Sequence, residues 1–160
     1  MYHLTEAYLL ATFIALVAAG WGALVAGGSL LPTLFQRTLP EAHAGRLLRA
    51  YWPNYFRFAV GLGLLATLVS ALAFPFSALP NLYVLLLTCV AAVMTACFFA
   101  ASNLIPQINA ARDSSDSERF ARLHRFNVTL TALGLLCGTA LLGAMIYVLP
   151  GQFTFWPTIG

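Results

Sequence analysis

The sequence predicts an all-α integral membrane protein, a bundle of four transmembrane helices that forms one domain over residues 1–160. Composition is the first observation behind this class. The chain is 61% hydrophobic and only 8% charged, whereas a soluble globular domain has about 25% charged residues. The second observation is a set of four apolar runs, each near the ~20 residues that cross a bilayer core. The spans are expected at about residues 7–34, 58–76, 82–105 and 126–149.

The first span begins without a positive leader. A secretory signal needs a cationic segment before its apolar core, and residues 1–6 contain no Lys or Arg, so this run is expected to be a retained span. Small residues recur every four positions along it, at Ala15, Ala19, Ala23 and Gly27. Such a stripe lets helix backbones approach closely in lipid and predicts a packing face.

A short helix lying in the membrane interface is expected in the next segment, residues 36–57. Leu39-Pro40-Glu41 predicts its start, with Pro at the first position and an acid in the first turn. Its apolar side is expected to consist of Leu47, Leu48, Tyr51 and Trp52. The second span would then follow as a separate helix.

The third span carries another stripe of small residues, Ala92, Ala96 and Ala100. Pro32 is predicted to kink or end the first span, and Asn103 with Pro106 to end the third, because proline lacks the amide hydrogen that continues a helix.

The last helix is expected to start near residue 116. Ser115 and Glu118 stand in the S-x-x-E spacing of a capping box, in which each side chain binds a free amide of the first turn. Further along, Gly134 and Gly138 form a G-x-x-x-G pattern that predicts close helix packing.

The charges predict the topology. All eight cations are arginine, and all lie in residues 36–57 and 107–125. Cationic loops stay in the cytoplasm, so both segments are expected there, with both termini in the periplasm and the protein in the inner membrane. Because these arginines flank apolar spans, they indicate membrane topology, and no nucleic-acid binding is expected.

Two halves of the chain show a weak internal repeat. Leu31-Pro32 and Ile105-Pro106 lie about 74 residues apart, and RAYWPN (residues 49–54) and RLHRFN (residues 122–127) about 73 apart. The sequence therefore predicts two duplicated helical hairpins, related by an axis along the membrane normal.

Several of these motifs resemble a known family. Leu39-Pro40, Ala44-Gly45 and the run Trp52 to Phe56 resemble the first loop of the transmembrane protein 205-like family, also catalogued as domain of unknown function 4149. The segment Phe120-x-Arg122-x-His124 is similar to its Phe-x-Arg-x-His-x-x-Ser pattern, and Asn103, Pro106 and Arg112 to its third-helix ending. The chain departs from the pattern at Asn127 and Thr131, where Ser and Asn are expected. The resemblance implies a small multi-span membrane protein without an established activity. The chain also resembles, more loosely and only in fold, the copper-resistance D type membrane proteins, and this resemblance suggests metal or haem binding.

His124 and His43 are the histidines expected on the cytoplasmic side. Two imidazoles could bind a haem iron axially, or copper with further ligands, so haem or copper is the alternative to an expectation of no cofactor. No pattern indicates catalysis, and the protein is not expected to be an enzyme.

The leading functional hypothesis is an accessory or scaffold subunit of a larger inner-membrane assembly. Its expected partners are the lipid bilayer and other membrane subunits or further copies of itself. The alternatives are a haem- or metal-binding protein using His124 and His43, and a carrier for a small apolar solute. The residues expected at the interface or in its motifs are Arg49, Trp52, Tyr55, Asn103, Arg112, Arg122, His124, Asn127, Gly134 and Gly138.

Overall fold

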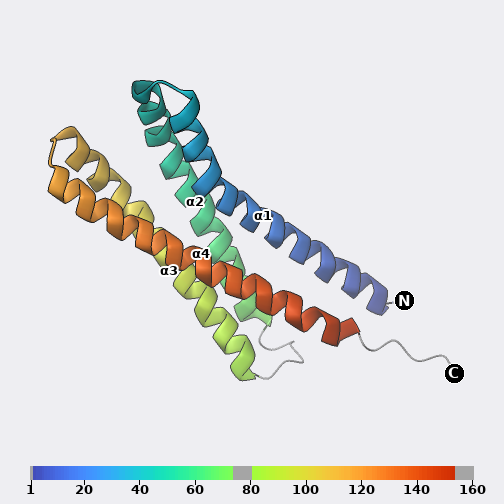
Figure 1. Ribbon diagram of the computed structural model, residues 1–160. Coiled ribbons are helices and arrows are strands. Elements are labelled where there is room, and N and C mark those ends of the chain that lie inside the picture. Colours follow the sequence, from blue (N-terminus) through green and yellow to red (C-terminus); the bar gives the residue numbers. More distant parts are fainter. Residues whose placement is uncertain (1, 74–80, 154–160) are drawn as a thin grey trace.

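A computed structural model describes residues 2–73 and 81–153 of the chain. Four long helices make up the described part: α1 (Tyr2–Thr38), α2 (Glu41–Ala73), α3 (Asn81–Asp113) and α4 (Ser117–Phe153). All four contain a stretch long and apolar enough to cross a membrane. The predicted class is confirmed: the chain is an all-α, multi-pass membrane protein built as a four-helix bundle (Figure 1).

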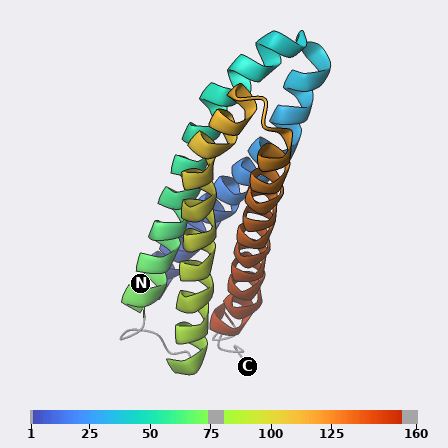
Figure 2. The same cartoon turned by 90° about the vertical axis from the view of Figure 1, so that its left-hand side faces the viewer.

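The helices form two hairpins whose connections lie at one end of the bundle. The α1–α2 corner and the α3–α4 turn lie at this end in both views (Figures 1 and 2). All eight arginines belong to the segments that form it, residues 36–57 and 107–125. We call this the charged end. The duplication of the two hairpins stays a prediction.

The helices are longer than the predicted spans. The predicted end of the third span at Pro106 is wrong, and Pro32, which was predicted to kink or end the first span, does not end α1. Pro32 and Pro106 lie inside α1 and α3, which continue to Thr38 and Asp113. The expected interfacial helix is not a separate element but the first part of α2, which begins at Glu41 and runs without a break through Pro53. Segments 36–57 and 107–125 are therefore mostly helical extensions of the spans.

Local hydrogen bonds explain both corners. The carbonyl of Pro40 accepts the amides of His43 and Ala44 at 2.9 and 3.0 Å, so Pro40 lies just before α2 and not at its first helical position. At the end of α3, Ser115 has a positive φ of 58°. Its amide bonds to Arg112 O (3.2 Å), and the next amide bonds to Ala111 O (3.0 Å). This is a Schellman motif, with serine in the left-handed position that glycine usually occupies.

The cap of α4 differs from the prediction. The Oδ1 atom of Asp116 accepts the amide of Arg119 at 3.0 Å, which makes Asp116 the capping residue. Ser115 cannot cap the helix because it occupies the left-handed position of the turn. The predicted start near residue 116 is correct, but the predicted Ser115–Glu118 box is wrong.

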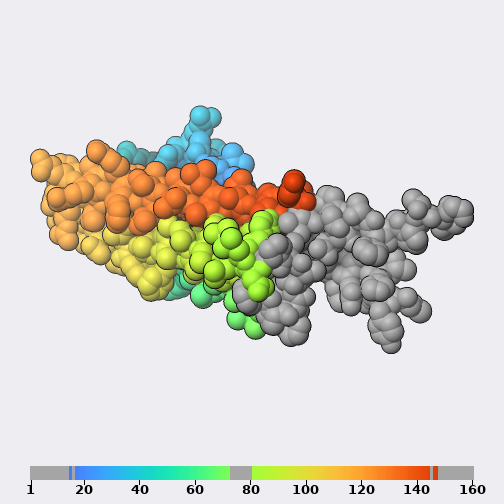
Figure 3. Space-filling view, turned by 90° about the horizontal axis from the view of Figure 1, so that it is seen from below, coloured from blue at the N-terminus to red at the C-terminus, as the bar shows by residue number. Residues whose placement is uncertain are grey.

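The core lies where α3 packs against its neighbours. The α2–α3 and α3–α4 pairs contact each other extensively, whereas α1 packs mainly on α2 and lightly on α4. Figure 3 shows α4 lying along α3 on one face of the bundle. Leu24, Phe56 and Phe98 are the largest fully buried side chains, contributed by α1, α2 and α3. Because α3 touches both α2 and α4, it is the central helix of the bundle.

The predicted packing stripes face outward. Ala15, Ala19 and Ala23 are exposed, while Trp21 and Leu24 form the buried face of α1. Ala92 and Ala96 are likewise exposed, because α3 buries its opposite face. Of the first stripe, only Gly27 is buried, against the rings of two tyrosines of α2.

The glycine pattern of α4 does mediate close packing. Gly134 is buried against the ring of Phe98, whose atoms would lie 3.0–3.2 Å from an added methyl group. Gly138 is buried against Trp21 of α1, where a methyl group would collide with the indole. The two positions bring α4 against α3 and α1, so this prediction is confirmed.

Candidate functional site: a cleft at the charged end

A cleft of ≈ 450 Å³ opens at the charged end, and all four helices contribute to its walls. Its polar lining consists of hydrogen-bonding and cationic side chains: Gln36, Arg49, Asn109, Arg112, His124, Asn127 and Thr131. Its apolar lining includes Pro32, Leu48, Trp52, Ile105, Ile108, Val128 and Leu135. In this cleft, polar side chains far apart in sequence come together around one space.

Two glycines set the distance between α1 and α2 beside the cleft. A methyl group at Gly28 would lie 2.7 Å from the Tyr55 hydroxyl oxygen, and one at Gly27 would lie 2.5 Å from that of Tyr51. The Tyr55 hydroxyl donates a hydrogen bond to Leu24 O at 3.1 Å. The close approach fixes α1 against α2 at the level of the cleft.

Aromatic rings hold Trp52 in the α2 wall. Its ring meets Tyr55 edge-on, with centroids 5.4 Å apart, and stacks on Phe56 at 5.9 Å. Both neighbours are buried, so the indole has little freedom to move. Arg49 precedes Trp52 by one helical turn and lies nearer the charged end.

The α3–α4 wall contains a buried polar contact. Asn127 is buried, and its Nδ2 atom donates to Ala101 O of α3 at 2.8 Å. One turn later, Thr131 donates its hydroxyl hydrogen to Asn127 O at 2.8 Å. The amide of Asn127 therefore ties α4 to α3, with both polar residues on the wall of the cleft.

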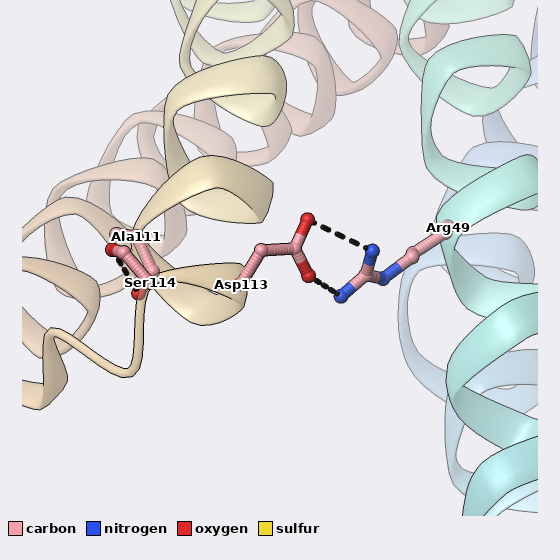
Figure 4. Close-up of polar contacts among 4 residues, drawn as sticks. All are labelled: Arg49, Ala111, Asp113 and Ser114. Atoms are coloured by element: carbon pink, nitrogen blue, oxygen red, sulfur yellow. Dashed lines mark hydrogen bonds and ion pairs between the residues drawn. The ribbon is translucent and has the colours of Figure 1, made fainter.

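An ion pair joins α2 to α3 (Figure 4), formed by the cleft-lining Arg49 and by Asp113. Arg49 donates to both carboxylate oxygens of Asp113, at 2.5 and 3.2 Å. Asp113 is the last residue of α3, beyond the predicted span. The hydrogen bond from Arg49 lowers the pKa of Asp113, and the charges of Arg49 and Arg112 act in the same direction. The same pair raises the pKa of Arg49.

Arg112 and His124 line the mouth from α3 and α4. The Arg112 guanidinium lies 5.8 Å from the centroid of the Phe120 ring, within range of a cation–π contact. The His124 ring stacks on the same phenyl ring, with centroids 5.5 Å apart and planes within 5°. Phe120 thus positions both polar groups.

The structure brings together half of the residues predicted from the sequence. Arg49, Trp52, Arg112, His124 and Asn127 line the cleft. Tyr55 is buried beside it, and the two glycines of α4 belong to the helix packing. The remaining predicted residues, Asn103 and Arg122, are exposed and are not among the lining residues.

The two histidines proposed as a cofactor pair are not brought into one cavity. His124 lines the cleft, whereas His43 is exposed near the start of α2 and is not among the lining residues. Within residues 2–73 and 81–153, no group of three or more His, Cys, Asp or Glu side chains is placed to hold a metal ion.

Sequence reasoning missed Gln36, Asn109 and the partner of Arg49, Asp113. Each lies in a helical extension, either beyond Pro32, which was predicted to kink or end its helix, or beyond Pro106, which was predicted to end its helix. A signal was present: Asn109 and Arg112 are three residues apart and so share a helix face. The prediction that α3 ends at Pro106 placed both residues outside a helix, so their shared face was not recognised.

The profile of one protein family, described as "Domain of unknown function (DUF4149)", matches residues 15–117. The chain belongs to this family. The match runs from α1 to the first residue of α4, so the DUF4149 region contains the parts of the cleft contributed by α1, α2 and α3. The segment Phe120-x-Arg122-x-His124 lies outside it. The transmembrane protein 205-like relationship stays a prediction. No curated protein and no solved structure matches the chain.

Proposed function

We propose that this DUF4149 protein is an accessory component of an inner-membrane assembly that acts by binding, with the cleft as its binding site. The carrying observation is the cleft itself, a space of ≈ 450 Å³ to which all four helices contribute. Binding pockets of this size, with apolar walls and a few convergent polar groups, are the usual form of a ligand site.

The proposed orientation places the charged end in the cytoplasm. The arginine asymmetry is complete, with eight in the two segments at this end and none elsewhere in the sequence. Cytoplasmic segments carry such an excess. The cleft would then open at the inner leaflet, within reach of lipid, of a neighbouring membrane subunit and of the cytoplasm.

The chemistry of the lining favours recognition. Arg49, Arg112 and Asn109 offer hydrogen-bond donors, and guanidinium groups pair strongly with oxyanions. Trp52 and Leu48 offer apolar surface on the same helix as Arg49. A ligand or partner segment with a polar or anionic end and an apolar body fits both sets of groups.

A haem- or metal-binding role is favoured by one observation, the place of His124 in the cleft. An imidazole is a ligand for either group. His43 does not line the same space, so in this arrangement it does not supply the second ligand.

Native mass spectrometry of the protein, extracted gently from its own membrane, tests the proposal. We expect to detect the chain together with bound subunits or an organic ligand.

A matched pair of variants locates the site. A Cβ atom added at Gly45 would meet nothing within 4 Å, and Gly45 lines the cleft. A Cβ atom at Gly61 on the same helix would be equally unobstructed, but Gly61 is not a lining residue.

Gly45→Phe is therefore expected to fill the mouth and release the bound species, while Gly61→Phe retains it. A bare wild-type chain, or equal retention by the two variants, would contradict the proposal. A mass excess of haem or metal that disappears in His124→Ala would favour the cofactor role instead.

A further inference from the structure

We propose that the cleft binds the phosphate headgroup of an anionic phospholipid, whose acyl chains leave the bundle between α1 and α4. This inference rests on the proposed binding function and names the class of ligand. Four features of the cleft carry it: a gradient of polarity, an available guanidinium, an exchangeable ion pair and a loosely packed side.

The polarity of the lining changes from the interior of the bundle to the charged end. Along α1 the lining residues Gly28, Pro32 and Gln36 follow one another at single turns, and the last is polar. Along α3, Ile105 precedes Arg112. The cationic groups therefore lie at the mouth. The deeper lining is apolar except for Asn127 and Thr131, whose side chains donate to backbone carbonyls of the bundle. This is the order of chains and headgroup in one leaflet.

Arg112 is the cation available to a ligand. Within the part of the chain that the structure describes, the ion pair formed is the one between Arg49 and Asp113, so the guanidinium of Arg112 keeps its donors. The contact with the face of the Phe120 ring positions the guanidinium of Arg112 and leaves its N–H groups free to donate hydrogen bonds. A planar guanidinium binds two phosphate oxygens at once, which makes arginine well suited to phosphate.

Arg49 can exchange partners. Its side chain is 41% exposed and that of Asp113 is 58% exposed, and ion pairs this open to solvent contribute little to stability. A phosphate at the mouth can therefore take the place of the Asp113 carboxylate at small cost. The two arginines would then hold the headgroup together, from α2 and α3.

The side of the cleft between α1 and α4 is loosely packed, because these two helices contact each other lightly. Val128 of α4 lines the cleft and is 51% exposed. Gly28 and Leu135 line the deeper part from α1 and α4. Acyl chains can follow these apolar groups outward into the bilayer. A phospholipid therefore gains apolar contacts that free phosphate cannot make.

The test uses the full chain in nanodiscs of equimolar phosphatidylglycerol and phosphatidylcholine, with retained lipids counted by native mass spectrometry. We expect phosphatidylglycerol to be preferred by about tenfold, equivalent to about 1.4 kcal/mol. Arg112→Gln should remove most of this preference. Arg122→Gln is the matched control, because it makes the same charge change at the charged end but outside the cleft. Asp113→Asn should raise the preference by releasing Arg49.

Each contrary outcome has a separate meaning. Equal losses in the two arginine variants would overturn the site in favour of diffuse surface charge, as would no gain in Asp113→Asn. Full displacement of the lipid by millimolar inorganic phosphate would identify a free anion as the ligand and overturn the lipid assignment. If no lipid is selected, but bound subunits are still lost in Gly45→Phe and kept in Gly61→Phe, this inference fails while the proposed function stands.

Discussion

Replacing Gly63 by alanine is expected to destabilise the bundle, whereas the same replacement at Gly61 is not. A methyl group at Gly63 would lie 2.6 Å from Thr95 Oγ1 and 3.1 Å from Thr95 Cα, between α2 and α3. At Gly61 it would meet nothing within 4 Å. Gly61 and Gly63 lie two residues apart in α2. Each variant replaces glycine by alanine there, so the change in intrinsic helix propensity is the same in both.

The magnitude follows from the closeness of the backbone of α3. Carbon atoms pack best at about 3.5–4.0 Å, so the methyl group at Gly63 needs about 0.5 Å more room from the Thr95 backbone, which no side-chain rotation can supply. Overpacking of this kind costs about 1–3 kcal/mol. We expect Gly63→Ala to be less stable than Gly61→Ala by about 2 kcal/mol, a change of about 25-fold in the unfolding equilibrium constant.

The assay is reversible unfolding by SDS in mixed micelles, followed by far-ultraviolet circular dichroism. Thr95→Ala in the Gly63→Ala background should recover part of the loss, because it removes the nearer Oγ1 atom but leaves the backbone of residue 95 in place. Equal stability of the two glycine variants would refute the close α2–α3 approach described above.

Three further changes test other parts of the fold. Ser115→Gly should stabilise the protein by about 1 kcal/mol, because glycine occupies the left-handed position without strain; the same SDS titration measures it. Tyr55→Phe should cost about 1 kcal/mol through loss of the hydrogen bond to Leu24 O, and an unchanged midpoint would contradict that bond. Because Arg49 lowers the pKa of Asp113, their attraction should be complete above the unfolded Asp pKa of about 3.9 and be lost as pH falls through the lowered folded value. Asp113→Asn should therefore reduce the pH dependence of stability below about pH 4, and leave it unaltered near neutrality.

The sequence could predict the number of helices and the gathering of charge at one end because both follow from hydropathy and from the arginines. It could not predict the ends of α1 and α3. Pro32 and Pro106 each remove one helical hydrogen bond, yet a membrane helix can continue past proline when its neighbours and local adjustments satisfy the freed groups. Gln36 and Asn109 line the cleft because α1 and α3 continue beyond these prolines.

The choice of buried face also lay beyond the sequence. On α1, Ala19 and Ala23 compete with Trp21 and Leu24, and both faces are apolar. In water, a polar face would separate inside from outside, but lipid removes that distinction because its chains are as apolar as leucine. Gly134 and Gly138 were identifiable because glycine pairs at that spacing have few other uses in a membrane helix.

The most direct test of the central claim, that the cleft is a binding site, is photo-cross-linking from inside it in the native membrane. A photoactivatable amino acid replaces Ala132, an exposed α4 residue that lines the cleft, or Ala140, an exposed residue of the same helix that does not. Mass analysis then identifies the products. We expect a discrete adduct at Ala132, enriched in anionic lipid or in one membrane subunit, and a product at Ala140 that mirrors the bulk bilayer. Identical products at the two positions would show that the cleft selects nothing and would contradict the account.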